Sequence, residues 1–333
     1  MTTSCASGSE VARRAHAEVQ TEVRLGPLVL PNPIVAASGT FGHGDEVAKL
    51  CDPSGLGAVT TKSQAPFPWD GNPAPRLHPT TGGMVNAVGL QGPGVDVWLA
   101  HDLPPLVGRG ARVIASVWGK QTDDFVTAAA AVASAPGVVA VEINLSCPNL
   151  HHGSPGEPRS ADHGELIAHD PAATAETVRA VVDAVGGVPV FAKLSPNATD
   201  VIPVAAAAMD AGATGLTCVN TVRAFLVDAG ARTAVLGAGN GGLSGAAIKP
   251  IALRVVHDVT RALPGVPVIG TGGVTSGEDA VEMLLAGASA VGVGTATFLD
   301  PRATLRIRDE VVAWCAAHGV TRVADLVGAL HER

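Results

Sequence analysis

The sequence predicts an α/β fold, a (β/α)8 TIM barrel of parallel strands. Eight short runs rich in β-branched residues alternate with longer Ala-rich runs, and 333 residues suit one such barrel. The alternative is a doubly wound open sheet, but no G-x-G-x-x-G follows the first strand, as a dinucleotide-binding sheet of that kind would prefer. The number of strands and their steady spacing favour the closed barrel.

The strands and helices can be assigned in order along the chain. The predicted strands are Pro33–Ala37, Ala58–Lys62, Arg112–Val117, Val138–Leu145, Val190–Leu194, Gly215–Val219, Val266–Gly270 and Ala290–Gly294. The predicted helices include Asp123–Ala133, Ala172–Val185, Val201–Ala211, Pro250–Leu263 and Ser276–Ala286. Asp200 and Ser276 are suitable N-caps, and Gly212 and Gly287 stand where helix C-termini need a positive φ.

Two segments interrupt the alternation of strand and helix, Gln64–Val95 and Pro148–Asp170. Both follow the carboxyl end of a strand, where barrel enzymes build their sites, so we expect lids or substrate loops there. We expect residues 1–22 to be a flexible N-terminal extension and residues 23–333 to form a single barrel domain.

Composition excludes several classes of function. The formal net charge is −8 and no run of Lys or Arg could follow a phosphate backbone, so nucleic acid is not an expected partner. No apolar run reaches the length of a membrane span, and the first residues lack a signal peptide, which favours a cytoplasmic location. The five cysteines are widely spaced and include no C-x-x-C, so no metal or iron–sulfur site is expected within this chain.

Polar residues in the predicted strands mark the candidate site, because parallel barrel strands are otherwise apolar. Glu142 lies within the fourth strand, and the others lie at or near carboxyl ends: Lys62, Asn144, Lys193, Asn220 and Thr221. A buried structural ion pair is the alternative for one lysine. Two lysines and two asparagines converging on one rim favour a catalytic site.

The seventh and eighth strands end in glycine-rich turns, GTGGV (Gly270–Val274) and GVGTA (Gly292–Ala296). Tight turns alone would explain either one. Because the loops after these two strands commonly bind phosphate in barrels, and glycine lets the backbone approach an anion, the pair predicts a phosphate site.

Cys147 follows the fourth strand directly. A thiol there is either a nucleophile, which usually has a histidine base nearby, or a general base shielded by its loop. His151 and His152 lie in a polar Gly/Pro-rich loop and are interpreted as solvated. Cys51, Cys218 and Cys315 are interpreted as buried, inert thiols.

Taken together, the motifs resemble those of dihydroorotate dehydrogenases, the flavin enzymes of pyrimidine biosynthesis. The resemblance runs from about Leu25 to the C-terminus in family order, through NPIVAASGTFG, GNPAPR, GMVNAVGLQGPG, INLSCPN, FAKLSPN, VNT, GGLSGAAIKP, IGTGGV and GASAVGVGT. It implies oxidation of (S)-dihydroorotate to orotate, with non-covalent FMN as hydride acceptor.

The resemblance also implies roles for individual residues. Cys147 would remove a proton from C5 of the substrate, Lys193 would face the pyrimidine end of the flavin, and Lys62 would touch both flavin and substrate. Further substrate contacts would come from Asn86, Ala87, Val88, Gly89, Leu90, Asn144, Asn149, Asn220 and Thr221. Further flavin contacts would come from Ser38, Ser63, Ser116, Asn144, Val219 and Gly245, and its phosphate would be bound by Gly272, Gly273, Gly294 and Thr295.

In having a cysteine as the base and no membrane helix, the chain resembles the class 1 enzymes. Among these it is most similar to the NAD-linked 1B subgroup. That subgroup implies a partner subunit carrying FAD and a [2Fe–2S] cluster, on a homodimer core or in a heterotetramer. The physiological electron acceptor, NAD⁺ or fumarate, stays open.

Some features depart from the family pattern. Ser116 stands where relatives often have asparagine, the loop 151–169 is long, and 223–232 differs from the usual sequence. Three alternatives remain: a dihydropyrimidine dehydrogenase-like FMN oxidoreductase, which Asn149 disfavours; a flavin-free lyase with Lys193 as Schiff base; and a non-catalytic scaffold.

Overall fold

The computed structural model describes residues 19–146 and 167–331. Eight parallel strands close into a barrel, which confirms the predicted fold class and rules out the open sheet. The last strand pairs with the first, Val291 opposite Ile34, so the sheet has no free edge. Each strand lies within two residues of its predicted bounds: β3 (Ile34–Ala36), β4 (Ala58–Thr60), β7 (Val113–Val117), β8 (Val138–Asn144), β9 (Val190–Lys193), β10 (Gly215–Cys218), β15 (Val268–Thr271) and β16 (Ala290–Val293).

The five named helices are also present. They are α4 (Thr122–Ala133), α5 (Pro171–Ala184), α6 (Val201–Asp210), α7 (Lys249–Ala262) and α8 (Gly277–Leu285). Asp200 caps α6 by accepting a hydrogen bond from the N–H of Ile202, and Ser276 forms a capping box with Asp279 at the start of α8. Both caps agree with the sequence-based expectation.

Other helices had no counterpart among the named predictions. They are α2 (Val95–Val97), the π-helix η2 (Trp98–Asp102), α3 (Leu103–Gly108), α9 (Ala296–Leu299) and α10 (Ala303–Ala317). Short 3-10 helices are η1 (Pro53–Gly55), η3 (Ile167–His169), η4 (Ala246–Ile248) and η5 (Val323–Leu326). In the described chain between β3 and β4 the only helical segment is η1, so the first strand has no α-helix after it. Within residues 19–146 and 167–331, no helix combines the length and apolarity needed to cross a bilayer.

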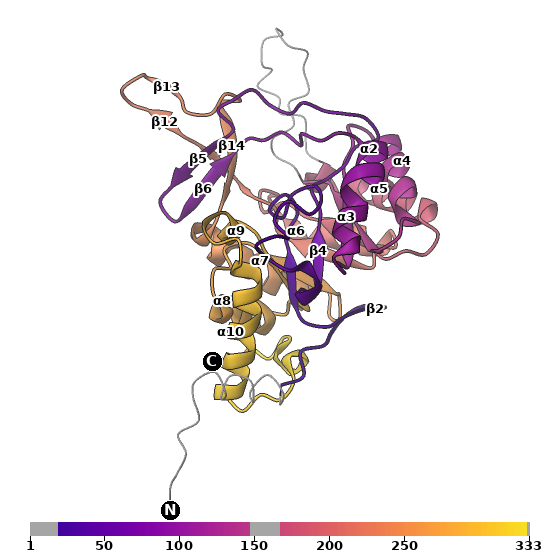
Figure 1. The fold of residues 1–333 in the computed structure, drawn as a ribbon, viewed down its shortest axis with the longest axis vertical. Coiled ribbons are helices and arrows are strands. Elements are labelled where there is room, and N and C mark those ends of the chain that lie inside the picture. The colour runs from indigo at the N-terminus through magenta and orange to yellow at the C-terminus, as the bar shows by residue number, and fades with distance from the viewer. Residues whose placement is uncertain (1–18, 147–166, 332–333) are drawn as a thin grey trace, which may run out of the picture.

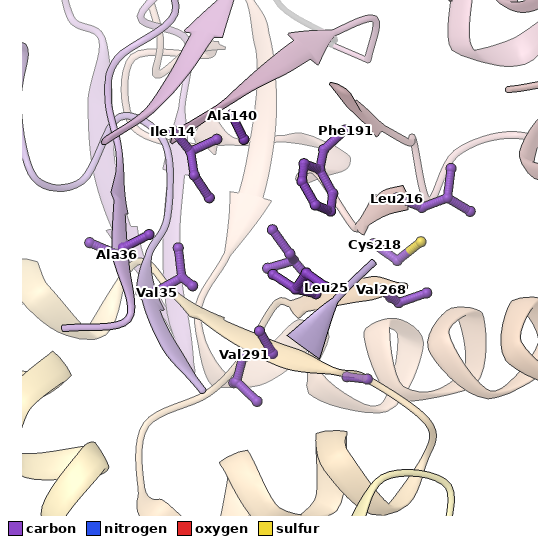
Figure 2. Packing of buried hydrophobic residues seen from close by; sticks show 14 of the residues in the cluster. Leu25, Val35, Ala36, Ile114, Ala140, Phe191, Leu216, Cys218, Val268 and Val291 are labelled. Atoms are coloured by element: carbon purple, nitrogen blue, oxygen red, sulfur yellow. The ribbon is translucent and has the colours of Figure 1, made fainter. Parts of the chain in front are cut away.

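The amino end of the barrel is closed by an antiparallel hairpin of β1 (Val23–Leu25) and β2 (Leu28–Leu30). Leu25 is fully buried, and Figure 2 shows it among the barrel residues Val35, Val268 and Val291. The contacts of the fold begin before this hairpin, within the segment expected to be an extension. Val19 is buried, and the N–H of Gln20 donates to the carbonyl of Thr321.

The opposite end of the barrel carries an antiparallel sheet that the sequence did not predict. It has the order β11 (Val222–Phe225), β14 (Asn240–Ser244), β6 (Gly83–Asn86) and β5 (Leu77–Thr80), and a small hairpin of β12 (Val227–Asp228) and β13 (Thr233–Ala234) extends from it (Figure 1). The segment Gln64–Val95 is therefore partly a sheet, not simply a loop. Most of Pro148–Asp170 lies outside the described residues.

Candidate active site

A cavity opens at the carboxyl ends of the barrel strands, between the rim and the antiparallel sheet. The empty space between its lining residues, counted out to open solvent, is about 1090 Å³. It is lined by residues that follow β3, β4, β10, β15 and β16 and by the last residues of β8 and β9, in agreement with the barrel architecture.

Most of the predicted site residues line this one cavity. Those that the fold brings together are Ser38, Lys62, Ser63, Asn86, Val88, Gly89, Leu90, Asn144, Lys193, Val219, Asn220, Thr221, Gly245, Gly272, Gly273, Gly294 and Thr295. They come from positions more than 250 residues apart in the sequence, and the barrel closure places them around a single space.

Two predicted residues do not line the cavity. Ser116, expected to contact a cofactor, is buried inside the barrel, where its hydroxyl lies 2.9 Å from that of Ser63 and donates to Glu142 at 3.2 Å. Ala87, directly after β6, is fully buried in a small cluster with Val85, Leu236 and Ala238, whereas Met84 and Asn86 of β6 line the cavity.

Cys147 and Asn149 lie outside the described residues. Ser146, the residue before Cys147, lies in the turn after β8 and is fully buried. The carboxamide of Asn220 donates to the Ser146 carbonyl at 3.1 Å and to its hydroxyl at 3.0 Å. Because Asn220 itself lines the cavity, the residue just before Cys147 is fixed at the cavity's edge.

Two lysines reach the cavity from different strands. Lys62 follows β4, and its N–H donates to the carbonyl of Gly42 at 3.0 Å, which ties the loop after β3 to the rim. Lys193 ends β9, and its ammonium lies 3.8 Å from a carboxylate oxygen of Glu142. The site therefore presents two cations to a bound ligand, one of them with a carboxylate beneath it.

Carboxamides and hydroxyls form a connected layer around these lysines. Asn144 donates to the Ser63 hydroxyl at 3.0 Å, and its carbonyl oxygen accepts from Asn220 at 3.3 Å. The Asn220 carbonyl oxygen in turn accepts from the N–H of Thr221 at 2.8 Å. The Thr221 hydroxyl is buried with no hydrogen-bond partner among the described residues, and Thr221 itself lines the cavity. Donors and acceptors alternating in this way suit a flat ring that carries both carbonyl and N–H groups.

The glycines at one end of the cavity fit a phosphate group. Gly273 and Gly245 have φ values of +80° and +101°. A Cβ on Gly273 would stand 2.5 Å from that of Lys249, and one on Gly245 would stand 2.6 Å from the Cα of Gly83. Only bare backbone allows these loops to pack so closely, and the cavity beside Gly294 and Thr295 is then lined by main chain. This is the lining that the phosphate prediction requires.

The cavity also includes residues that the sequence analysis did not assign. They are Ala37, Gly39, Thr40, Leu77, Met84, Ser244, Ile248, Thr271, Val274 and Phe298. Several stand inside the motifs quoted above, beside assigned residues, so the motifs carried a signal for them. Leu77 and Phe298 had none, because β5 and α9 were not predicted.

Comparison with known proteins gives the same family throughout. The family described as dihydroorotate dehydrogenase matches residues 21–314. A Solibacter usitatus protein named as a dihydroorotate dehydrogenase of the A (fumarate) type is 45% identical, over 91% of this chain and 96% of its own length. Proteins named dihydroorotate dehydrogenase B (NAD(+)), catalytic subunit, are 44% identical in Pelobacter propionicus, over 92% and 97% of the two chains, and 42% identical in Listeria monocytogenes, over 91% and 96%.

The match extends across almost the whole barrel and covers every strand that contributes to the cavity. The motif order, the closed barrel and the residues gathered at its rim agree with it. This chain belongs to the dihydroorotate dehydrogenase family.

Proposed function

We propose that this chain oxidises (S)-dihydroorotate to orotate, a step of UMP biosynthesis, in the cytoplasm and with bound FMN. The observation that carries the proposal is the convergence of two lysines, three asparagines and a threonine on one cavity whose far end is lined by glycine backbone. FMN, when bound, accepts the hydride that leaves C6 of the substrate.

The chain's own residues would do the rest. Cys147, adjoining the fixed Ser146, would take the proton from C5, so that the substrate loses one proton and one hydride. Asn144, Asn220 and Thr221 would orient the pyrimidine ring through its carbonyl and N–H groups. Asn86 belongs to β6, and its carboxamide donates to the carbonyl of Gly242 at 3.3 Å. This contact would hold the segment that contains Asn86 against the pyrimidine ring.

The cations would supply the electrostatics. Lys193 would lie near the pyrimidine end of the flavin, where an ammonium stabilises the negative charge that arrives with the hydride. Lys62 would contact flavin and substrate together. Gly272, Gly273, Gly294 and Thr295 would bind the phosphate, and Ser38, Ser63, Val219 and Gly245 would contact the rest of the cofactor.

We also infer that electrons leave through a second subunit. Several relatives are named as the catalytic subunit of an NAD⁺-linked enzyme, a name that implies another subunit in those proteins. By the same inference, FAD and a [2Fe–2S] cluster would belong to that partner, and the assembly would contain a homodimer of this chain. A relative of the fumarate type makes fumarate the competing acceptor.

The sharpest test of the mechanism is Cys147→Ala. The variant is expected to purify yellow, with FMN bound, and to lose flavin reduction by dihydroorotate about 10²–10⁴-fold, the usual contribution of a general base. Stopped-flow absorbance of the flavin measures this directly. In the unmodified protein the rate is expected to rise with pH as the thiol ionises.

Cys315→Ala is the matched control, because it removes a buried thiol from α10, which contributes no residue to the cavity. It should reduce its flavin at the normal rate. Near-normal flavin reduction in Cys147→Ala would show that Cys147 is not the base. If the unmodified protein purifies without colour, FMN is excluded and the Schiff-base lyase remains as the alternative.

A further inference from the structure

We propose that Glu142 is a positioning residue of this site: it sets the charge that Lys193 presents to the ligand and the direction in which the carboxamide of Asn144 faces. Glu142 lies on β8, two residues before Asn144, and points into the barrel below the cavity. Its role in flavin chemistry rests on the function proposed above, whereas its pairing with Lys193 does not.

The first observation concerns charge. The side chains of Glu142 and Lys193 are 2% and 7% exposed, and the ammonium stands 3.8 Å from the carboxylate. Lys193 lines the main cavity, while Glu142 lines only a smaller one inside the barrel. A ligand above Lys193 therefore meets a cation whose charge is partly offset from below. In a buried site, where screening is weak, that offset changes how strongly an added negative charge is stabilised.

The second observation concerns hydrogen-bond direction. As an ionised carboxylate, Glu142 can only accept hydrogen bonds. It accepts from the hydroxyl of Thr217 at 2.9 Å and from that of Ser116 at 3.2 Å. The Ser116 hydroxyl has a single proton, which it donates to Glu142. In its 2.9 Å contact with the Ser63 hydroxyl, Ser116 must therefore be the acceptor and Ser63 the donor. Ser63 must in turn accept from Asn144, as the 3.0 Å contact with the Asn144 nitrogen requires.

The chain of donors thus runs from Asn144 through Ser63 and Ser116 to Glu142. An asparagine carboxamide alone could face either way. Here its nitrogen faces Ser63 and its oxygen faces Asn220. The carboxylate holds this orientation from one side, and the Thr221 N–H, which donates to the Asn220 oxygen, holds it from the other. Glu142 thereby acts on two groups at the cavity surface without touching the ligand. Ser116, displaced from its expected place against the cofactor, is the link between them.

Three variants of the FMN-loaded protein separate the two effects. Glu142→Gln removes the negative charge and supplies an N–H donor, so the direction of the hydrogen bonds through Ser116 and Ser63 can reverse. Ser116→Ala interrupts this series of hydrogen bonds and keeps the negative charge of Glu142. Thr217→Val is the matched control. It removes a hydroxyl donor to the same carboxylate, but it leaves both the charge of Glu142 and the hydrogen bonds from Asn144 to Glu142.

The measurements are the flavin midpoint potential and the affinity for orotate, the reaction product. Glu142→Gln alone should raise the potential by about 30 mV, a tenfold change for a two-electron couple, because Lys193 then stabilises the reduced flavin more strongly. Glu142→Gln and Ser116→Ala should both bind orotate about tenfold more weakly, and Thr217→Val should do neither. A Glu142→Gln potential equal to that of Thr217→Val would overturn the charge role. Unchanged orotate affinity in Ser116→Ala would overturn the orienting role.

A flavin-free measurement tests the pair independently. In urea denaturation of the apoprotein, Glu142→Gln leaves a buried ammonium unpaired, so adding Lys193→Met should restore part of the lost stability. Strictly additive losses would overturn the pairing. If the protein binds no FMN but the two substitutions are coupled, the proposed function fails while the ion pair stands.

Discussion

At the scale of single residues, burial decides which thiols can react. The three cysteines in the described part of the chain, Cys51, Cys218 and Cys315, are all buried, which confirms that part of their interpretation as buried, inert thiols. Burial raises the pKa of Cys218 to about 12 and that of Cys315 to about 11, and it also raises the pKa of Cys51, which contacts the hydroxyl of Thr304. Since the thiolate is the reactive form, we expect these groups to be unreactive near neutral pH.

The resulting prediction concerns alkylation. Iodoacetamide at pH 8 should leave Cys51, Cys218 and Cys315 of the native protein unlabelled, while the same treatment in guanidinium chloride labels all three. Peptide mass spectrometry reads out each site separately. Labelling of Cys218 in the native protein at the rate of a free thiol would contradict the burial described here.

At the scale of elements, a contact between two helices supports the loop beside the glycines. Lys249 at the start of α7 lies 2.6 Å from Asp279 and 2.8 Å from Glu282 of α8. Asp279 also accepts from the N–H and hydroxyl of Thr275, just after the Gly272–Gly273 turn. Burial acts to raise the pKa of Asp279, but the hydrogen bonds from Lys249 and Thr275 outweigh it and lower the pKa to about 2. The sequence indicated the cap at Ser276 but not the lysine from the preceding helix.

Asp279→Asn is therefore expected to lower the free energy of unfolding at pH 7 by about 2 kcal/mol. Because the folded-state pKa is depressed, the contribution is complete above the unfolded pKa of about 4 and is lost as pH falls toward about 2. Urea denaturation across this range should show the two proteins converging at low pH. Glu278→Gln, an exposed neighbour in the same helical turn, should change stability by less than about 0.5 kcal/mol. Equal stability of Asp279→Asn and the unmodified protein at pH 7 would disprove the linkage.

At the scale of the whole molecule, the antiparallel sheet encloses the cavity from outside the barrel. Its strands come from two insertions, one after β4 and one after β10, and Asn86 of β6 pairs with Gly242 of β14. Figure 1 shows this sheet and the β12–β13 hairpin extending beyond the barrel. Phe225 and Val227, on β11 and β12, are 59% and 61% exposed there.

The proposed electron route gives a prediction for the isolated chain. The purified protein should oxidise dihydroorotate with an artificial dye as acceptor but reduce neither NAD⁺ nor fumarate at a comparable rate. Adding the electron-transfer subunit from the same host should then confer NAD⁺ reduction, followed at the NADH absorbance. Efficient NAD⁺ reduction by the chain alone would refute the two-subunit proposal, and efficient fumarate reduction would assign it to the other acceptor class.

The sequence by itself determined the barrel and most of its rim. Strand periods are local, so β8 and β9 could be located from their own residues, and Lys193 and Asn144 were conspicuous because parallel strands are otherwise apolar. The glycine turns after β15 and β16 were likewise visible from composition. Cys147 and Asn149 stay predictions, because they lie outside the described residues.

Only the tertiary structure decided the rest. The pairing of β6 with β14 joins residues some 156 positions apart, and no local pattern encodes such a partner. The same is true of Glu142, whose significance depends on Ser116 and Lys193 arriving from two other strands. A side chain's neighbours across a closed barrel are set by the register between strands, which is a property of the assembled sheet and not of any one segment.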